Sequence, residues 1–561
     1  IAEDWIDHVQ LNEKYGAGPW RSIDTGFRGE YWSKAIWLFH DSPTLTEAFL
    51  QKYYDSMILQ AEHIMECHSA YRYMSNWGVI ENHGLFEIGV CLPQSEKTKQ
   101  FIAFAVKNLE VQVRMQIMPD GVHWEQSPMY HNEVLHCLLD VILLAKRNDI
   151  ALPDVILRQT EKMAMADVAW LKPDHHIVMM GDSDDVDVRD RISVAAYLFL
   201  NPVLRFGGFD RLDYESIWDL GMKAGEEYAG MERRKPDFTS LFLEHSGNTY
   251  FRSDWSERAN FLHLHSGTMG AGHGHSDKLH IDLVVNGEDV LMDGGRYTYV
   301  SGPKRFSYKD PSGHNTITVD DLPFTVCKDS WECSKLSQPV KENFRCMELA
   351  EFAQAGQLGY MDLPGGVYVN RKVVYIKPDL YVLADEMYTG DRHTYQQYFH
   401  FNNHGTVTQN APGEKKFPCV AYRGKMAEAD FYFVSAQVKA ELKSGHIARH
   451  YNVEEENTVC KVTKQGDGFT SLITVIDAQP GRPLSIEKLP VRSALKQTDY
   501  PETMAEALKI TAGEKEYVVI LCHQEVNSPT DLVEVDGCMG YGNVIVFDKA
   551  GDVLVGDVLN W

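Results

Sequence analysis

The densest group of residues able to do chemistry is the glycine-rich stretch GAGHGHSDK, in which His273 and His275 flank a single glycine. Glycine lets a ligand or a metal ion approach the backbone closely, and the short spacing lets both rings point into one space. The strand that follows turns at an Asn-Gly pair, and the hairpin brings Asp293 back toward His275. His314 stands at the start of a later strand. Two histidines and one aspartate predict a site for zinc or a similar divalent ion, although a histidine taken singly is more often structural.

A second set of polar residues lies in the amino-terminal half. Asn82 and His83 are adjacent in ENHGLFE, where we predict a helix start. Tyr130 falls in the first turn of a long helix, which Ser127 and Pro128 introduce as N-cap and first helical residue. By pattern alone, Tyr130 is an ordinary interfacial tyrosine and Asn82 an ordinary helix cap.

Two different periodicities divide the chain into a helical half and a β-rich half. Helical spacing runs through residues 1–235, with helices expected near 45–75, 97–115, 155–170 and 190–202 besides the long one. This pattern predicts a bundle, toroid or solenoid of amphipathic helices.

Beyond Lys235-Pro236-Asp237 the sequence changes to short runs such as KVVYI and YVVIL, separated by Gly, Pro, Asn and Asp turns. Such runs predict antiparallel sheets packed as a sandwich. We expect domains at 1–235, 236–480 and 481–561, the last a small β domain. The fold class is therefore α+β and multidomain.

Charge and composition restrict the partners of the protein. The 561 residues carry a formal net charge of −26, which argues against nucleic acid and anionic lipid. A local group of His, Arg and Lys in a cleft can still attract an anion. No run of eighteen apolar residues exists, so no membrane span is expected.

The ten cysteines form no CxxC motif, and several lie in apolar strand or helix patterns that predict buried thiols rather than disulfides, which favours a reducing compartment. The chain opens without Met and in a helical pattern, so we expect an N-terminal piece to be missing. The compartment stays open between the cytoplasm and the periplasm or exterior of a bacterium. A homo-oligomer is compatible with the sequence.

Four stretches together resemble the heparinase II/III-like superfamily of polysaccharide lyases. They are NHGLFE (82–87), DGVHWEQSPMYH (120–131), GHGHSDKLHIDLVVNGEDVLMDGGRYTY (272–299) and GHNTITVD (313–320). The third is long and specific, whereas the others are short but occur in the order of the family. The resemblance implies an (α/α) toroid, incomplete here, followed by an antiparallel β-sandwich, with an active site between the two halves.

The resemblance also implies roles for individual residues. Tyr130 matches the tyrosine that acts as general acid and, on some substrates, also as base. Asn82 matches an asparagine that neutralises the uronate carboxylate, with His83 beside it. His273 matches a catalytic or carboxylate-binding histidine, and Tyr299 and Arg305 fall where the family often contacts substrate.

His275, Asp293 and His314 match the family's metal site, which would hold zinc, manganese or calcium in a structural role. The segment 299–314 is rich in Lys, Arg and Tyr and follows no single subfamily.

The chemistry of β-elimination suits these residue types. A proton α to a carboxylate is weakly acidic, so the carboxylate charge must be neutralised as the enolate-like state forms. A base then takes the C5 proton, and an acid protonates the leaving O4. Free tyrosine has a pKa of about 10 and needs nearby positive charge to act as a base at neutral pH; His83, His273 and Arg305 are candidates to supply it.

The leading hypothesis is a lyase acting on an acidic polysaccharide such as heparan sulfate, chondroitin sulfate or hyaluronan. An alginate or other polyuronate lyase is the closest alternative. Arg296, Lys304, Arg305 and Lys309 could line a cleft for a sulfated chain or form a solvated loop.

Two other classes stay open. A metal-containing glycoside hydrolase on a toroid could use carboxylates from GDSDDVDVRD, namely Asp182, Asp184, Asp185 and Asp187. A run of this kind is more often a loop that orders helix ends. The remaining class is a non-catalytic glycan-binding protein.

Overall fold

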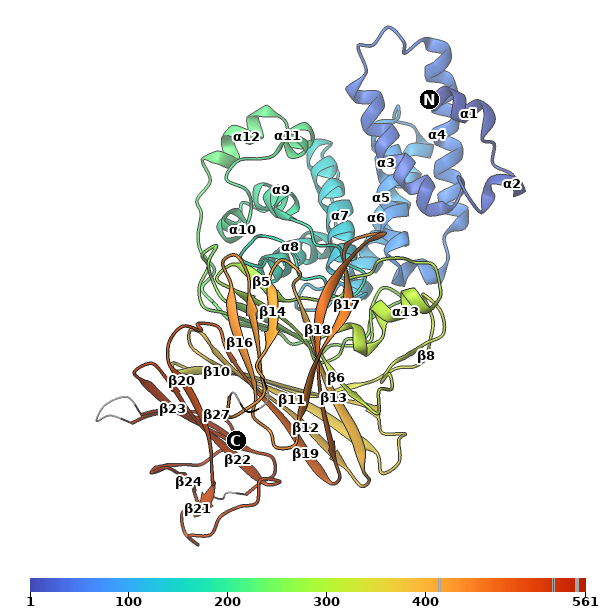
Figure 1. Cartoon of the computed structure of the whole chain (residues 1–561). Coiled ribbons are helices and arrows are strands. Elements are labelled where there is room, and N and C mark those ends of the chain that lie inside the picture. Colours follow the sequence, from blue (N-terminus) through green and yellow to red (C-terminus); the bar gives the residue numbers. More distant parts are fainter. Residues whose placement is uncertain (412, 414, 527, 529, 550–553) are drawn as a thin grey trace. The chain divides into compact units, whose positions relative to one another are not determined.

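The computed structural model describes residues 1–411, 413, 415–526, 528, 530–549 and 554–561. The chain forms two compact units. The first contains residues 1–169 and 187–235, and the second contains residues 170–186 and 236–561. The helical and β-rich halves predicted from periodicity are confirmed, except that the short segment 170–186 belongs with the strands (Figure 1).

The first unit is helical. Its elements are α1 (Ala2–His8), α2 (Glu13–Gly16), α3 (Ser22–Leu38), α4 (Glu47–Cys67), η1 (Ala70–Met74), α5 (Asn76–Cys91), α6 (Glu96–Gln116), α7 (Pro128–Arg147), α8 (Asp154–Trp170), α9 (Arg189–Phe199), α10 (Pro202–Gly207), α11 (Tyr214–Leu220) and α12 (Met222–Ala229). The helices expected near 45–75, 97–115, 155–170 and 190–202 are all present. The long helix begins at Pro128, as predicted.

Local capping explains where several of these helices begin. The Thr46 hydroxyl accepts a hydrogen bond from the amide of Phe49 at the start of α4. Ser95 and Thr98 form a reciprocal capping box at the start of α6. Each cap satisfies backbone N–H groups that have no partner within the helix.

The prediction of a helix start within residues 81–87 was wrong. α5 begins at Asn76, so Asn82 and His83 lie in the middle of the helix. The helix is buried on nearly all sides, with only Trp77, Val90 and Cys91 partly exposed. A helix without a solvent face has no amphipathic stripe, and periodicity therefore could not find its ends.

Glycines allow α3 and α5 to approach each other closely. A Cβ atom built on Gly84 would lie 2.1 Å from the carbonyl oxygen of Gly26. One built on Gly29 would lie 2.6 Å from the carbonyl oxygen of Gly84. Only glycine fits at these contacts, so the NHG sequence of α5 is partly a packing requirement.

The second unit consists of strands with two short helical elements. Its strands are β1 (Leu241–Leu243), β2 (Asn248–Arg252), β3 (Phe261–His265), β4 (His280–Val285), β5 (Glu288–Leu291), β6 (Ile317–Val319), β7 (Val326–Cys327), β8 (Cys333–Lys335), β9 (Pro339–Cys346), β10 (Ala350–Tyr360), β11 (Val367–Ile376), β12 (Leu380–Thr389), β13 (His393–Phe401) and β14 (Thr406–Gln409). They continue with β15 (Cys419–Arg423), β16 (Glu428–Phe433), β17 (Lys439–His450), β18 (Val453–Gly466), β19 (Phe469–Asp477), β20 (Leu484–Leu489), β21 (Arg492–Ser493), β22 (Ala505–Ala512), β23 (Lys515–Cys522), β24 (Val533–Val535), β25 (Cys538–Gly540), β26 (Val544–Asp548) and β27 (Val555–Asn560). The helical elements are α13 (Pro303–Lys309) and η2 (Pro311–Gly313).

The strands build three main antiparallel sheets. A nine-stranded sheet runs β1-β2-β3-β4-β5-β13-β18-β17, with β6 also paired to β13, and an eight-stranded sheet runs β14-β15-β16-β19-β12-β11-β10-β9. Apolar residues from both fill one continuous core. This is the predicted sandwich. A third sheet runs β20-β22-β23-β26-β27, and a second core joins it to the eight-stranded sheet.

The central strands of the eight-stranded sheet are buried on both faces. On β11, Val373 and Tyr375 belong to the core shared with the nine-stranded sheet, whereas Val374 and Ile376 belong to the core shared with the third sheet. Alternate residues of a strand point to opposite faces, so a strand covered on both sides reads as a continuous apolar run. This explains the run KVVYI.

The expected domain at 481–561 remains a prediction. Its residues form the third sheet and the small sheet β21-β24-β25, and Ile486, Leu508 and Val519 pack in the shared core.

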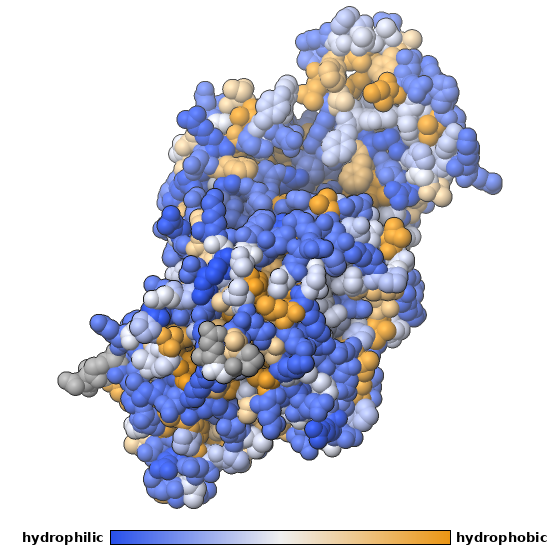
Figure 2. Space-filling model, viewed as in Figure 1, coloured by the Kyte–Doolittle hydropathy of each residue, from blue (hydrophilic) through white to orange (hydrophobic). Residues whose placement is uncertain are grey.

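Hydrophilic residues cover most of the face that Figure 2 shows, in keeping with the charged composition. No described helix combines the length and apolarity that a membrane span requires. All ten cysteines are free thiols, and five of them are buried: Cys137, Cys419, Cys460, Cys522 and Cys538.

Candidate active site

The predicted site residues divide between the two units. Asn82, His83 and Tyr130 lie in the helical unit. The other six lie in the β unit: His273, His275, Asp293, Tyr299, Arg305 and His314. Within the β unit these six residues form one continuous group of contacting side chains, together with Asp182.

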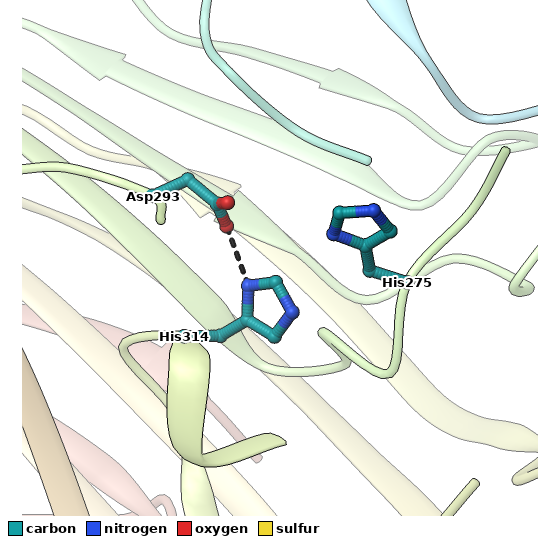
Figure 3. A group of neighbouring side chains, drawn as sticks. All are labelled: His275, Asp293 and His314. Atoms are coloured by element: carbon teal, nitrogen blue, oxygen red, sulfur yellow. Dashed lines mark hydrogen bonds and ion pairs between the residues drawn. The ribbon is translucent and has the colours of Figure 1, made fainter. Parts of the chain in front are cut away.

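His275, Asp293 and His314 form a compact, fully buried group (Figure 3). One ligand atom from each lies within 4.8 Å of the others. Nδ1 of His314 lies 2.7 Å from a carboxylate oxygen of Asp293. Nδ1 of His275 and Nε2 of His314 have no hydrogen-bond partner. Buried polar atoms are rarely left unpaired, so the two free ring nitrogens fit a metal ion held by these three residues.

Asp182 connects this group to the predicted catalytic residues. Its carboxylate lies 2.8 Å from Nε2 of His275 and 3.0 Å from Nδ1 of His273. Arg305 donates to the same carboxylate at 2.8 Å. Burial opposes ionisation, but the two histidines and Arg305 hold the pKa of Asp182 well below its usual range. One buried carboxylate therefore orients three of the six residues.

A chain of buried polar contacts through His280, Asp282 and His263 supports Asp293. Nδ1 of His280 lies 3.5 Å from the Asp293 carboxylate, and Nε2 of His280 lies 3.1 Å from Asp282. Asp282 also lies 2.9 Å from Nδ1 of His263. Burial opposes protonation, but Asp282 and Asp293 raise the pKa of His280 to about 8. Such contacts fix the orientation of a ligating carboxylate.

Aromatic rings surround His273. The ring of Trp331 meets it edge-on at a centroid distance of 5.3 Å, and that of Tyr299 does so at 5.9 Å. The hydroxyl of Tyr299 accepts a hydrogen bond from Arg296 at 2.6 Å. Tyr299 thus lies beside His273, and its phenol oxygen accepts from a guanidinium, while its contact with substrate stays a prediction.

The glycines on either side of His273 lie in close packing, which Gly274 cannot leave for a larger residue. A Cβ atom on Gly274 would lie 1.6 Å from the carbonyl oxygen of Met269. A Cβ atom on Gly272 would lie 3.1 Å from the ring of Trp331. Gly274 thereby lets the chain fold back so that His273 and His275 both reach Asp182.

The four basic residues proposed to line a cleft are engaged within the protein. Arg305 and Lys309 are fully buried, and Nζ of Lys309 donates to the carbonyl oxygens of Gly272 and Ser330. Arg296 forms a bidentate pair with Asp184, and Lys304 pairs with Glu454. These contacts favour a structural role for this segment over a solvated loop.

The carboxylates considered for a hydrolase also face cations. Besides Asp182 and Asp184, Asp185 lies 3.4 Å from Lys172 and 2.9 Å from His176, and Asp187 pairs with Arg189 at 2.6 Å. A carboxylate paired with a cation is poorly suited to hold the proton that a hydrolytic general acid donates. The run GDSDDVDVRD is a set of ion pairs.

In the helical unit, Tyr130 is the third residue of α7 and is partly exposed. His131, the next residue, is fully buried. Its Nδ1 accepts the backbone N–H of His123 at 3.2 Å, and its Nε2 lies 3.1 Å from the carbonyl oxygen of Met163. Burial lowers the pKa of His131 to about 3, so the ring is neutral and one tautomer satisfies both contacts. His131 fixes the loop that leads to Tyr130.

Asn82 is buried within the helical unit, and its amide is already bonded. Nδ2 donates to the carbonyl oxygen of Gly78 at 2.7 Å and to Gln112 at 3.4 Å. Oδ1 accepts from Asn108 at 3.4 Å. Contact with a uronate would require exchange of these bonds, and the role of Asn82 stays a prediction.

Sequence reasoning missed a second amide, Asn76. Its backbone N–H and its Nδ2 donate to the two carboxylate oxygens of Glu125, at 3.1 and 2.8 Å, and its own Oδ1 has no partner. Glu125 is only 2% exposed and precedes Tyr130 by five residues. The pair ties the start of α5 to the loop before Tyr130. Residues about fifty positions apart cannot be paired from spacing alone, so the sequence carried no signal.

His83 lies among carboxylates. Its ring nitrogens lie 3.8 Å from Glu30, 3.5 Å from Glu87 and 3.4 Å from Asp140. Burial opposes protonation, but Cys137, Asp140 and Glu87 hold the pKa of His83 well above its usual value. His83 thus lies at the centre of a buried cluster within the helical unit, and its place beside the substrate stays a prediction.

Family models of known proteins match both the helical half and the β-rich half of the chain. The model of the heparinase II/III N-terminus matches residues 2–202, and that of the heparinase II/III-like C-terminal region matches residues 235–482. The chain is 25% identical over 343 residues to a heparin-sulfate lyase of Pedobacter heparinus, covering 58% of this chain and 47% of that protein. It is 22% identical over 413 residues to a heparin-sulfate lyase of Bacteroides thetaiotaomicron, covering 69% of this chain and 54% of that protein.

The chain thus spans about half the length of these curated relatives. Among solved structures, the heparan sulfate lyase of Pedobacter heparinus matches with a TM-score of 0.70 and 19% identity, over 94% of this chain and 78% of that one. A structure of heparinase III matches with a TM-score of 0.75 and 16% identity, over 93% and 78% of the two chains. These likenesses confirm the fold.

Proposed function

Because the chain belongs to the heparinase II/III family, we propose that it is a polysaccharide lyase that cleaves heparan sulfate by β-elimination. The two family matches, which together cover most of the chain, carry this proposal. The relatives named as heparin-sulfate lyases favour heparan sulfate over chondroitin sulfate, hyaluronan and alginate.

The reaction removes the C5 proton of a uronate and breaks the C4–O4 bond. A C4=C5 double bond forms, and the leaving O4 takes a proton. In the proposed mechanism Tyr130 moves protons, because it is partly exposed on a helix start that His131 and the Asn76–Glu125 pair hold in place. A positioned acid or base contributes about 10²- to 10⁴-fold to such a step.

His273 is proposed to stabilise the negative charge that develops on the uronate. Its Nδ1 lies 3.0 Å from the Asp182 carboxylate, and this contact fixes the orientation in which the ring would meet the substrate. Trp331 and Tyr299 restrict the motion of the ring. Asp182 and Arg305 are assigned to positioning, because both are fully buried and bonded to each other.

A divalent metal ion is proposed at His275, Asp293 and His314. When bound, it would supply a fixed positive charge that holds the strand ends and loops carrying these residues. The two unpartnered ring nitrogens and the bond from His275 to Asp182 support this assignment.

The test follows ultraviolet absorbance of the conjugated C4=C5 double bond during incubation with heparan sulfate, chondroitin sulfate, hyaluronan and alginate. We expect absorbance to rise with heparan sulfate and to be lost in Tyr130→Phe. Tyr197→Phe is the matched control, because the hydroxyl of this tyrosine of the helical unit donates to Glu227 rather than to a predicted site residue. New reducing ends without absorbance would overturn the elimination and indicate a hydrolase. A rise with another glycan alone would overturn the substrate.

A further inference from the structure

A second group of metal-ligating side chains lies inside the helical unit, where neither the sequence nor the family resemblance led us to expect one. It contains two imidazoles and three carboxylates from three helices: Glu30 on α3, His83 and Glu87 on α5, and His136 and Asp140 on α7. Two sets of three within it, His83–Glu87–Asp140 and Glu30–His136–Asp140, each offer ligand atoms within 4.8 Å of one another.

The helices place these residues by simple geometry. His83 and Glu87 are four residues apart on α5, as are His136 and Asp140 on α7, so each pair shares one face of its helix. The close contact of α3 with α5 through Gly26, Gly29 and Gly84 carries Glu30 to the same place. A glycine contact of this kind lets backbones approach closely enough for short side chains from both helices to meet.

The distances around His83 suit a small metal ion. Its Nε2 lies 3.5 Å from Oε1 of Glu87 and 3.4 Å from Oδ2 of Asp140. Zinc–ligand bonds of about 2.0–2.2 Å at tetrahedral angles place neighbouring ligand atoms about 3.3–3.6 Å apart. Both separations fall in this range, and all three ligand atoms lie within 4.8 Å of one another.

The polar atoms at this centre are buried but only loosely paired. Nε2 of His83 and Oε1 of Glu87 form no hydrogen bond, although each residue is only 1% exposed, and they meet as an ion pair at 3.5 Å. Oδ2 of Asp140 lies 3.4 Å from the same ring nitrogen. Buried polar atoms that approach one another without hydrogen bonding suit an ion that binds between them.

The group is reached from a cavity of about 430 Å³, lined by residues that include Lys34, Glu87, Asp140 and Trp218. Nζ of Lys34 lies 2.6 Å from Oδ2 of Asp140, and the Lys34 side chain is 28% exposed. Lys34 therefore lines the cavity and occupies Oδ2 of Asp140, so a cation that binds this oxygen must displace it. Imidazole and carboxylate ligands together suit zinc and its first-row neighbours rather than magnesium.

We propose that His83, Glu87 and Asp140 bind a divalent first-row transition-metal ion, zinc first, inside the helical unit. The fourth position faces the cavity, where Lys34 gives way to water. The ion links α5 to α7. Glu30 of α3 lies 3.1 Å from His136 of α7, and this pair orients the ligands. His83 is then a metal ligand rather than a neighbour of the substrate.

The first test measures zinc bound per chain by elemental analysis, after equilibration with zinc and removal of the free ion. Glu87→Gln is compared with the wild type and with Glu81→Gln. Glu81 is a buried carboxylate on the same helix that pairs with Arg72 at 3.1 Å. Burial raises the pKa of Glu81 to about 7, so the neutral amide is a mild replacement there.

We expect Glu87→Gln to hold one zinc fewer per chain than both other proteins. Equal zinc content in all three folded proteins would overturn the proposal. A second measurement needs no variant: anomalous diffraction at the zinc edge from zinc-soaked crystals of the full chain. A peak bonded to His83, Glu87 and Asp140 is expected. Zinc at His275, Asp293 and His314 alone, with Lys34 still on Asp140, would also overturn it.

Discussion

Oδ1 of Asp182 lies 2.8 Å from Nε2 of His275, and this contact leaves Nδ1 of the ring for the candidate metal site with Asp293 and His314. A carboxylate that accepts from one ring nitrogen fixes the tautomer and makes the other nitrogen a lone-pair donor. The same carboxylate contacts His273 and Arg305. The candidate catalytic histidine and the candidate metal ligand are thus oriented by one residue.

Replacing Asp182 with asparagine should destabilise the protein strongly. Arg305 is fully buried, and the substitution would remove the carboxylate that neutralises it. Breaking a buried pair by removing one partner costs about 3–5 kcal/mol. Chemical denaturation of Asp182→Asn should show a loss of this size in the free energy of unfolding. Asp187→Asn is the control: its pair with Arg189 is about a quarter exposed, so about 1 kcal/mol or less is expected. Equal losses in the two variants would contradict the central role of Asp182.

Gly274→Ala should disrupt the HGH loop. The added methyl group would meet the carbonyl oxygen of Met269 at 1.6 Å, so the backbone must move and carry His273 and His275 away from Asp182. We expect a loss of zinc binding in the β unit, measured by elemental analysis, together with a lower rate of heparan sulfate cleavage. Gly16→Ala is the control, because nothing lies within 4 Å of its Cβ position. Unchanged metal content in Gly274→Ala would show that the loop tolerates the shift.

Much of the fold could be predicted from the sequence, because the period of apolar residues records which faces are buried. α4, α6 and α8 have one solvent-facing side and were found. α5 was not delimited, because almost all of its surface is buried. The third sheet explains the apolar runs of β11 and β12, which a two-layered sandwich alone would not require.

The site was predictable only in part. HGH and the hairpin after it place His273, His275 and Asp293 by local geometry, whereas Asp182 reaches them from more than ninety residues away. The sequence showed Asp182 only as one member of an acidic run. Pairing of this kind depends on the tertiary fold, which the periodicity of apolar residues does not report.

Gly84→Ala should destabilise the helical unit even though alanine is the better helix former. The gain in helix propensity is about 1 kcal/mol. The new Cβ atom would lie 2.1 Å from the carbonyl oxygen of Gly26, and relief requires α3 and α5 to separate. Overpacking of this kind costs about 1–3 kcal/mol. The cost should lie at the upper end, because the atoms that the new methyl group meets belong to the backbone of α3 and cannot rotate away. Thermal unfolding should show a lower Tm for Gly84→Ala. Gly225→Ala on α12 is the matched control, since its Cβ atom would make only an ordinary contact at 3.7 Å with Ile217, and its Tm should be equal or higher.

The buried residue His523 should make the stability of the β unit depend on pH. Nδ1 lies 2.6 Å from Glu386, and Nε2 lies 3.1 Å from Glu506. Burial opposes protonation, but both carboxylates raise the pKa of His523 above its usual 6.5. Burial also opposes ionisation of the carboxylates, but Lys372 and His523 lower the pKa of Glu386 to about 2, and His523 and then Lys488 lower that of Glu506 to about 2.

The free energy of unfolding that this cluster contributes changes with pH in opposite directions on the two sides of its optimum. Below pH 6.5 the folded and unfolded states both hold the His523 proton, so its stabilisation is complete, and it is lost as pH rises through the folded pKa. The two carboxylates stabilise fully above their unfolded pKa of 4.5 and lose this contribution as pH falls toward 2. The cluster should therefore contribute most between pH 4.5 and 6.5.

We expect the difference in unfolding free energy between wild type and His523→Gln to peak in that window and to fall above it by at most about 1.4 kcal/mol per pH unit for one proton. The exposed residue His8 provides the control, and His8→Gln should follow the wild-type curve. A difference that stays flat from pH 5 to pH 9 would mean that His523 is neutral in the folded protein and that the two carboxylates are neutralised by lysines alone.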